Sequence, residues 1–471
     1  MDNLFFSQGR KRELTAMERS FNRPGFKFAV IYGRRRVGKT SLIAEFIREG
    51  NKKAIYYMAT EQNDGANLKD FSEAVFELYP SGRAIADGFL TWDKAFEYIA
   101  AQAAGENIVV AIDEFPYLAG ANKAISSILQ RRIDLTLSKT NIMLILCGSS
   151  MSFMENQVLG YKSPLYGRRS EQYKITPLDY YDSAEFFAGA AVEQKLIGYA
   201  VTGGIPQYLN IIGRYKTVTE GIRESFFDKF GSLYEEPQNL LKQELREPAV
   251  YNTIIASIAN GASKLNEIAT KSGEDNSKCG KYIKGLISLG IIEKETPIGT
   301  AKGRNGVYRL KDNMYRFWYR FVPENLSNIE SGKSEHVYDK KVAPFLPEYM
   351  GHIFEDVCKQ YMIRQNANGS LPFVFDAIGR WWGNNPVLKR EEEIDLVAVS
   401  KDAAIFGECK WRNEKAGVEI LDDLKRKAVL FKAQNAYYYI FSKSGFSDAL
   451  KASASKDGGI SLIGLNDLFN S

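Results

Sequence analysis

The chain has 471 residues, with 62 Lys and Arg against 57 Asp and Glu and only two His. This length exceeds one ordinary hydrophobic core and predicts a multidomain protein of about three units. Two histidines are too few for most zinc enzymes and His-based nucleophiles, so we expect chemistry that rests on carboxylates, lysine and bound metal. The four cysteines contain no Cys-x-x-Cys pair, which argues against a disulfide framework and a zinc knuckle.

The apolar runs of the chain are short. The longest, around 108–112 and 142–147, have the length of strands and fall far short of the ~20 residues that a membrane span requires. The first residues, MDNLFFSQGRKREL, lack the order of charged, apolar and small residues that marks a signal peptide. We therefore expect a cytoplasmic protein without a membrane partner.

The stretch FKFAVIYGRRRVGKTSLIAEFI reads as an apolar strand, a tight turn and an amphipathic helix. The turn matches G-x-x-x-x-G-K-[ST], in which backbone N–H groups and a helix N-terminus surround the phosphates of a nucleotide. Lys39 is expected to reach the β- and γ-phosphates of ATP, and Thr40 to bind Mg²⁺. The residues of this turn that we expect to contact ATP are Gly33, Arg34, Arg35, Arg36, Val37, Gly38, Lys39, Thr40 and Ser41.

Two further strands are expected to end beside this turn. NIVVAIDEF is a continuous apolar run, typical of a parallel strand covered on both faces, and it ends in Asp113 and Glu114. Because open α/β sheets bind ligands at the carboxyl ends of their strands, Asp113 would hold Mg²⁺ and Glu114 would polarise the attacking water. NIMLILCGSS ends at Ser149, which would either sense the γ-phosphate or only begin a turn.

Two neighbouring arginines follow in SPLYGRRS. Arg168 or Arg169 could contact the γ-phosphate as an arginine finger, from the same subunit or from a neighbouring one. The alternative is a solvated basic turn.

Six short stretches together resemble the prokaryotic, chiefly archaeal, P-loop ATPases of the AAA+/STAND group. They are GRKREL (with Arg10 and Glu13), 33–40, VVAIDEF, LCGSS, PLYGRR and TGGIPQYL. The resemblance covers roughly the first half of the chain. It implies an ATP-binding and ATP-hydrolysing domain with a helical lid, in which Pro206 contacts the nucleotide. Within the lid we assign no arginine as a second sensor.

A basic segment occupies the middle of the chain. Residues 271–320 carry seven Lys and four Arg against five acidic residues, which indicates an anionic partner. The pattern of 246–322 predicts three short helices and a hairpin, the layout of a winged helix-turn-helix that binds DNA. A protein-binding module, or one that only joins its neighbours, is the alternative. The third helix is expected to bury Ile283, Leu286, Ile287 and Leu289 and to expose Lys278, Lys281 and Lys284, while Lys302 and Arg304 lie on the wing.

The aromatic stretch NMYRFWYRFV, residues 313–322, is expected to form an interdomain core, although a platform for stacked bases is conceivable. The polar stretch after it is expected to be a linker.

The stretch EIDLVAVSKDAAIFGECKW, residues 393–411, predicts an antiparallel hairpin that turns at Lys401 and Asp402. If residue 400 pairs with 403, the numbers of paired residues sum to 803, so Asp395 faces Glu408 and residue 393 faces Lys410. All these charges then share one face, with Cys409 on the other. Asp395 and Glu408 would hold a divalent cation through oxygen, and Lys410 would orient or deprotonate a water, which suits phosphodiester hydrolysis.

The spacing D-x(12)-E-x-K resembles the PD-(D/E)xK nuclease superfamily, which implies that Glu355, on the preceding helix YMGHIFEDVCKQYMI, joins the metal shell. IGRWWG, EIDLVA and GECKW also resemble a C-terminal domain of unassigned function that is fused to such ATPases. The alternatives are a degraded nuclease fold and a salt-bridged hairpin.

The sequence thus predicts an α/β multidomain protein with ATP, Mg²⁺ and DNA as its ligands. A homo-oligomer or a protein partner is a further expectation. The predicted parts are a P-loop NTPase core with a parallel sheet (1–175), a helical lid (176–245), a winged helix-turn-helix (246–322), a linker (323–343) and a PD-(D/E)xK-like α/β domain (344–471). A regulatory switch that does not cleave DNA is the alternative function.

Overall fold

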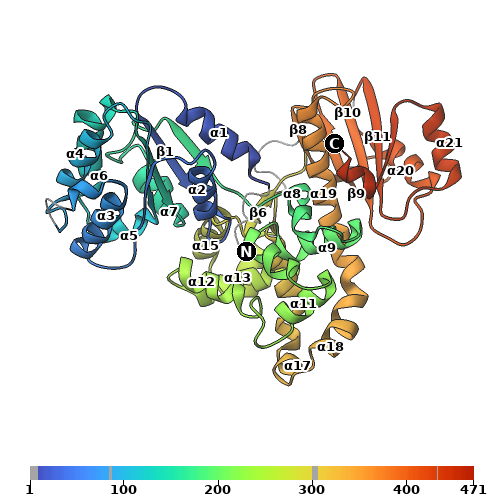
Figure 1. The fold of residues 1–471 in the computed structure, drawn as a ribbon. Helices are drawn as coiled ribbons and strands as arrows, with labels where there is room; N and C mark the ends of the chain where they lie inside the picture. Colours follow the sequence, from blue (N-terminus) through green and yellow to red (C-terminus); the bar gives the residue numbers. More distant parts are fainter. Residues whose placement is uncertain (1–8, 84–86, 300–305, 432, 471) are drawn as a thin grey trace. The chain divides into compact units, whose positions relative to one another are not determined.

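The computed structural model describes residues 9–83, 87–299, 306–431 and 433–470 (Figure 1). The chain divides into two compact units, Met1–Pro177 with Ile205–Gln207, and Leu178–Gly204 with Tyr208–Ser471. Among the helices of the described ranges, none combines the length and the apolar character needed to cross a bilayer. The expected wing residues Lys302 and Arg304 lie outside the described residues.

The first unit contains a five-stranded sheet in the order β2-β3-β4-β1-β5, and all its neighbouring strands are parallel. The strands are β1 (Lys27–Tyr32), β2 (Ala54–Met58), β3 (Val109–Asp113), β4 (Met143–Gly148) and β5 (Glu171–Lys174). The helices are α1 (Lys11–Phe21), α2 (Lys39–Arg48), α3 (Asp64–Leu78), α4 (Trp92–Gln102), α5 (Phe115–Ala121), α6 (Ile125–Leu135) and α7 (Met151–Phe153). The parallel, buried strands expected from the apolar runs are therefore confirmed.

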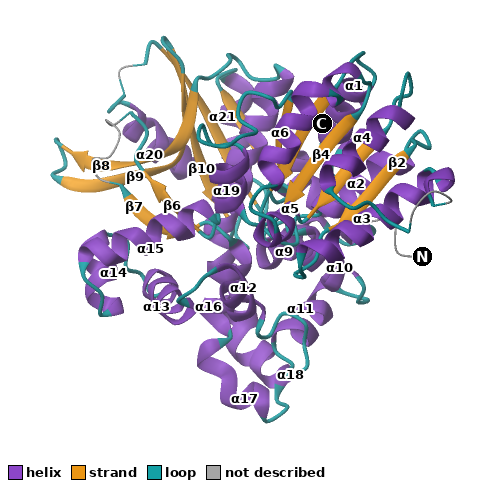
Figure 2. Cartoon of the chain, turned by 90° about the vertical axis from the view of Figure 1, so that its left-hand side faces the viewer, coloured by secondary structure: helices purple, strands orange, loops and turns teal. Residues whose placement is uncertain are grey.

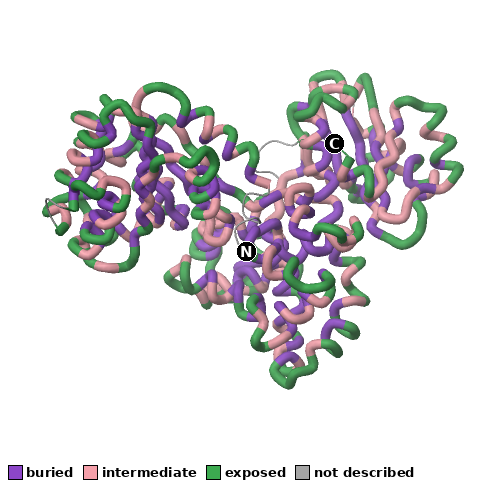
Figure 3. The backbone as a smooth tube through the Cα atoms, viewed as in Figure 1, coloured by how far each residue is buried: buried purple, intermediate pink, exposed green. Residues whose placement is uncertain are grey.

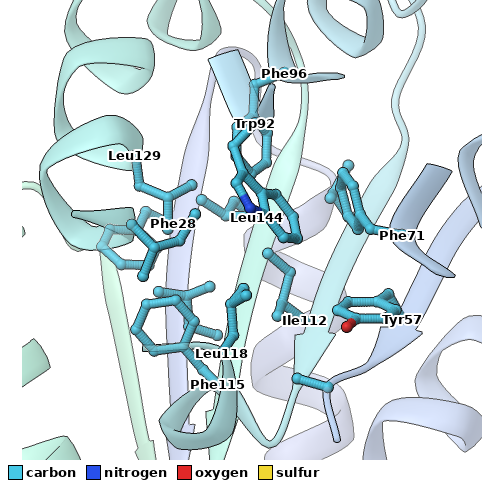
Figure 4. Close-up of a cluster of buried hydrophobic side chains, with 14 of the residues drawn as sticks. Phe28, Tyr57, Phe71, Trp92, Phe96, Ile112, Phe115, Leu118, Leu129 and Leu144 are labelled. Atoms are coloured by element: carbon cyan, nitrogen blue, oxygen red, sulfur yellow. The ribbon is translucent and has the colours of Figure 1, made fainter. Parts of the chain in front are cut away.

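One face of this sheet is covered by a large apolar core from α3 to α6 (Figure 4). Alternate residues of the strands, such as Ile112 and Leu144, point into it, because side chains of a strand alternate between its faces. The ring of Phe71 on α3 lies 5.1 Å from that of Trp92 and 5.6 Å from that of Phe96. A core packed on this scale fixes the carboxyl ends of the strands, where the first site lies.

The second unit begins with a group of helices. They are α8 (Tyr180–Ser183), α9 (Val192–Thr202), α10 (Pro206–Gly213, whose first two residues belong to the first unit), α11 (Val218–Phe226), α12 (Glu236–Glu244), α16 (Asn313–Phe321), α17 (Leu326–Glu330) and α18 (Ser334–Val337). The aromatic residues of α16 are buried, as expected for a core rather than a stacking surface. Figure 3 colours the whole described backbone by burial. Short 3-10 and π turns fill much of 323–345.

Three helices and a hairpin stand between these elements, in the expected order. They are α13 (Pro248–Ala259), α14 (Leu265–Ser272), α15 (Asn276–Ser288), β6 (Ile292–Glu295) and β7 (Val307–Leu310). The two strands pair antiparallel. Ile283 and Leu286 of α15 are buried as predicted, but Ile287 is 38% exposed and Leu289, which follows the last residue of the helix, is only half-buried, which corrects the prediction. Cys279 and Tyr282 fill the inner face instead, one turn nearer the helix start.

The C-terminal part of the second unit is a sheet in the order β12-β11-β10-β9-β8 (Figure 2). β10, β11 and β12 are parallel, whereas β9 runs antiparallel to both β8 and β10. The elements are α19 (Leu346–Asn368), β8 (Ala377–Asn385), β9 (Arg390–Val399), β10 (Ala403–Lys410), α20 (Val418–Ala428), β11 (Asn435–Ser442), α21 (Asp448–Lys456) and β12 (Ile460–Gly464). β8 and β9 form a long curved ribbon in Figure 2.

Candidate active sites

The expected phosphate loop joins β1 to α2, and its backbone shape depends on glycine. Gly33 has no room for a side chain, because a Cβ there would lie 2.3 Å from the carbonyl oxygen of Ile175. Gly38 adopts a φ of +89°, which L side chains rarely accept, and it directly precedes the first residue of α2. Arg36 also has a positive φ, of 69°. The loop therefore ends on the N-terminus of a helix, where phosphate is favoured.

Lys39 and Thr40 lie where the G-x-x-x-x-G-K-[ST] pattern predicts. Lys39 is buried, and its Nζ donates to the carbonyl oxygen of Arg34 at 3.0 Å, so the ammonium lies over the loop. The hydroxyl of Thr40 donates to Oδ2 of Asp113 at 2.7 Å. The residues expected to share one magnesium ion, Thr40 and Asp113, therefore meet directly.

Asp113 is fully buried at the carboxyl end of β3 and is surrounded by donors. Besides Thr40, the hydroxyl of Tyr56 donates to Oδ2 at 3.0 Å, and the backbone N–H of Glu114 donates to Oδ1 at 2.8 Å. Burial and the Asp113 carboxylate both raise the pKa of Tyr56, so this phenol stays protonated. The sequence analysis missed Tyr56, which lies on the neighbouring strand β2.

Glu114 is held by the tip of β4. Its Oε2 accepts from the hydroxyl of Ser149 at 2.9 Å and from the backbone N–H of the same residue at 3.3 Å. Glu114 has a φ of 50°, a left-handed conformation that is uncommon outside glycine. Strain of this kind collects at functional sites, where surrounding contacts hold it in place. The predicted water-polarising carboxylate is therefore positioned by the predicted serine.

Arg10 and Pro206 bring distant segments of the first unit to the loop. Nη2 of Arg10 donates to the carbonyl oxygens of Val37 at 3.0 Å and of Thr176 at 2.6 Å. A Cβ on Gly38 would lie 3.8 Å from Cγ of Pro206, so this proline is within van der Waals range of the loop. Arg10 belongs to the GRKREL stretch, and its contact with the loop backbone is a finding that no sequence pattern foretold.

The arginine finger candidates both have internal partners. The guanidinium of Arg168 forms two bonds to the carboxylate of Asp134, at 2.7 and 2.8 Å. Nη1 of Arg169 donates to the carbonyl oxygen of Leu159 at 3.5 Å, a long contact. Arg168 would have to leave Asp134 in order to reach a phosphate, and its role stays a prediction.

The basic face of α15 is exposed, as the sequence predicts. Lys278, Lys281 and Lys284 are all solvent-accessible. Lys278 forms an ion pair with Glu274 at 3.0 Å, which offsets part of its charge. Tyr282, on the inner face, hydrogen bonds to Glu247. Lys281 and Lys284 are the other two exposed cations of this helix.

The hairpin of β9 and β10 has the predicted register. Val399 pairs with Ala404 and Leu396 with Gly407, so the partner numbers sum to 803. The pairing with β8 differs, because Gly379 pairs with Val397 whereas Trp381 pairs with Ile394. β9 thus has one extra residue in the interval that contains Asp395. Bulges of this kind re-aim side chains and are frequent beside active sites.

Asp395 is half-buried and lies near two other carboxylates. One of its oxygens accepts from the backbone N–H of Cys409 at 2.9 Å. Burial, together with the charges of Glu408 and Glu355, raises the pKa of Asp395 to about 7. Nζ of Lys410 donates to Oε1 of Glu408 at 2.6 Å, and this carboxylate raises the pKa of the lysine although burial alone would lower it. Glu408 and Lys410 are thus in direct contact, and Glu408 and Glu355 lie near enough to Asp395 for their charges to raise its pKa.

Glu355 enters this group from α19 and carries an ion pair of its own. Its Oε2 lies 3.3 Å from Nε of Arg380 on β8. Glu393, which was expected to face Lys410, is mostly exposed, and its Oε2 lies 3.4 Å from Nη2 of Arg380. The extra residue of β9 shifts the alternation between Glu393 and Asp395, which accounts for this difference from the prediction.

Two oxygens of the carboxylate group lack a hydrogen-bond donor. Oε2 of Glu408 and Oε2 of Glu355 are buried without a hydrogen-bond partner among the described residues. The ion pairs of Glu408 with Lys410 and of Glu355 with Arg380 balance the charges of the two carboxylates, but they leave these two oxygens without a hydrogen bond. Across the described ranges, however, no three His, Cys, Asp or Glu side chains stand in an arrangement that holds a metal ion as drawn. The donor chemistry suits Mg²⁺, and binding requires the side chains to turn toward one point.

Two separate parts of the chain match known protein families, but only the first of these families has an assigned activity. Residues 7–212 match a family described as an ATPase domain predominantly from Archaea, and residues 318–421 match a family of archaeal and bacterial proteins of unknown function. The Walker-type ATPase PABY2304 of Pyrococcus abyssi has a similar structure, with a TM-score of 0.52 and 19% identity over 66% of this chain and 96% of that one. This likeness supports the fold.

One relative matches almost from end to end. An uncharacterized protein of Methanocaldococcus jannaschii is 35% identical over 450 residues, which cover 92% of this chain and 95% of the relative. The chain therefore belongs to the family of this Methanocaldococcus jannaschii protein, and its first domain is a P-loop ATPase domain of the archaeal type.

Proposed function

We propose that this chain is a Mg²⁺-dependent ATPase that binds DNA through the α13–β7 segment and cleaves it in its C-terminal domain. The observation that carries the cleavage proposal is the convergence of Asp395, Glu408 and Lys410, with the buried, unpartnered Oε2 of Glu408. The order of the elements, helix α19, strands β8 to β10, helix α20 and strand β11, supports a PD-(D/E)xK-type domain.

In the first domain, Lys39 and the loop backbone would bind the β- and γ-phosphates of ATP. Thr40 and Asp113 would hold Mg²⁺, which would neutralise the charge that develops on the γ-phosphate. Glu114 would accept a proton from the attacking water, and its hydrogen bond to Ser149 keeps the carboxylate oriented. Arg10 and Pro206 would fix the shape of the loop from either end.

DNA binding would use the exposed basic face of α15. Lys281 and Lys284 would contact the phosphate backbone, which makes the affinity salt-dependent. The double variant Lys281→Glu and Lys284→Glu should then weaken binding to any DNA sequence. The matched control is Glu274→Lys. It removes the carboxylate that now pairs with Lys278 and adds a positive charge, so it should strengthen DNA binding. Unchanged DNA affinity in both would mean that this segment only joins its neighbours.

In the C-terminal domain, Asp395 and Glu408 would hold Mg²⁺, with Glu355 as a third oxygen donor. The ion would polarise the phosphodiester and lower the pKa of an attacking water. Lys410 would orient this water and offset the negative charge of the transition state. For this, Lys410 must release Glu408, since the two now form an ion pair with 2.6 Å between Nζ and Oε1.

A DNA cleavage assay tests this proposal. The full chain is incubated with supercoiled plasmid or single-stranded DNA and Mg²⁺ or Mn²⁺, with and without ATP. Glu408→Gln and Lys410→Met should abolish cleavage, whereas Glu391→Gln, at an exposed carboxylate of the neighbouring strand β9, should leave it intact. Equal cleavage by all of these variants would show that the activity lies elsewhere.

The ion pairs of the C-terminal site favour a second candidate. Lys410 and Arg380 occupy the carboxylates of Glu408 and Glu355, which is also what a regulatory domain without catalysis would show. In that case the chain is an ATP-dependent switch that binds DNA and leaves it whole. Tight, salt-dependent DNA binding without cleavage in either metal would support the switch.

A further inference from the structure

A cavity in the second unit is lined by an unusual number of cations. It has a volume of about 330 Å³ and lies among α13, β7, α16, α19 and β8. Four arginines line it, together with one imidazole and a single carboxylate. These charged lining residues are Arg309, Arg316, Arg320, Arg380, His352 and Glu348.

We propose that this cavity binds a phosphate group, carried by a molecule of about mononucleotide size. Arginine presents planar N–H donors that match the oxygens of phosphate and carboxylate, and several guanidiniums around one cavity select for a multiply charged anion. The volume lies at the lower end of small-molecule sites, which suits one nucleotide rather than a larger ligand. None of the phosphate-loop residues 33–41 lines this cavity, and neither do Glu355, Asp395, Glu408 and Lys410.

Carboxylates outside the cavity wall hold its deeper arginines in place. Nη2 of Arg309 lies 2.7 Å from Glu293 and 2.8 Å from Asp356, and Arg316 lies 3.7 Å from the same aspartate. Neither acidic partner is among the residues that line the cavity. Glu295 lies 3.4 Å from Arg309, and Arg380 is paired with Glu295, Glu355 and Glu393. These carboxylates offset the charge of the three guanidiniums, but they also fix them before a ligand arrives, which lowers the entropic cost of binding a group that matches their N–H donors.

The entrance carries a weaker ion pair. Arg320 pairs with Glu348 at 3.0 Å, and their side chains are 43% and 68% exposed. Exposed pairs of this kind contribute little to stability, so an incoming anion can displace Glu348 from Arg320 at small cost. Tyr308, half-buried in the wall, offers a ring against which a base could stack. The same chemistry fits a free nucleotide or a terminal nucleotide of a nucleic acid.

Calorimetric titration of the full chain tests the proposal, in a Lys39→Ala background that removes phosphate binding at the P-loop. The ligands are AMP, adenosine, and a short DNA strand with either a 5′-phosphate or a 5′-hydroxyl. We expect AMP or the phosphorylated strand to bind and the two molecules without the phosphate to bind at least tenfold more weakly. Binding of AMP identifies a free nucleotide as the source, and binding of the phosphorylated strand alone identifies a nucleic-acid end.

Two variants at the entrance assign the binding to this cavity. Arg320→Ala should weaken it about tenfold, the loss expected for one charge-assisted contact. Glu348→Gln removes the competing carboxylate and should strengthen it severalfold. Both side chains are exposed, so neither change should unfold the chain. Absence of binding by both phosphorylated ligands, or affinities that neither variant alters, would overturn the proposal.

Discussion

The substitution Asp395→Asn should stabilise the C-terminal domain at pH 8 while it abolishes metal binding. Burial and two neighbouring carboxylates raise the pKa of Asp395 from 3.8 to about 7, so the folded protein binds its proton more tightly than the unfolded chain does. Stability therefore falls as the pH rises from 3.8 to about 7 and changes little above that. At ~1.4 kcal/mol per pH unit, the ionised carboxylate costs at most about 4 kcal/mol at pH 8.

Hydrogen exchange measures this effect locally, in peptides that cover β10 and α19, because a chain of two units need not unfold in one step. At pH 8 the variant should exchange more slowly than wild type, and near pH 4 the two should be nearly equal after correction for intrinsic exchange. Mg²⁺ should slow exchange in wild type only. The reasoning is refuted if Asp395→Asn exchanges faster at pH 8, or if the difference from wild type does not depend on pH.

Three further changes test other parts of the structure. Ser149→Ala removes the hydroxyl that orients Glu114, so kcat for ATP hydrolysis should fall about tenfold with little change in nucleotide Kd, as steady-state kinetics and titration would show. Gly33→Ala places a methyl group against a backbone carbonyl, and calorimetry should show the first unit destabilised by about 2 kcal/mol. Arg309→Ala removes from Asp356 the nearer of its two guanidinium partners, which holds the pKa of this carboxyl low although burial raises it, and leaves Arg316 at 3.7 Å. Urea unfolding should show a loss of about 3 kcal/mol at pH 7, at the lower end for a broken buried pair, and a smaller one at pH 4.

Much of the fold follows from short-range patterns. The buried strands β1, β3 and β4 could be predicted because each is a continuous apolar run that ends in polar residues. The register of β9 and β10 could be predicted because a tight turn fixes the parity of the strands it joins. The inner face of α15 was predicted in part, since helical spacing identifies a face without saying where it is centred. Tyr282 is buried at one edge of this face, whereas Ile287, at the other edge, is exposed.

The contacts that shape the sites were less accessible to sequence reasoning. Arg10 reaches a carbonyl 166 residues away, and Tyr56 reaches Asp113 from a neighbouring strand, so both depend on packing between distant segments. The extra residue of β9 depends on its pairing with β8, which the hairpin alone does not reveal. The lining of the arginine cavity comes from five separate elements, and only its net positive charge was visible in the local composition.

Manganese titration of the nucleotide-free chain, followed by electron paramagnetic resonance, tests the central claim that Asp395 and Glu408 share one cation. The account predicts one bound Mn²⁺ at pH 8 in wild type and in Glu391→Gln. That ion should be absent in Asp395→Asn and in Glu408→Gln. Equal manganese binding by all four proteins, or none by wild type, would contradict it.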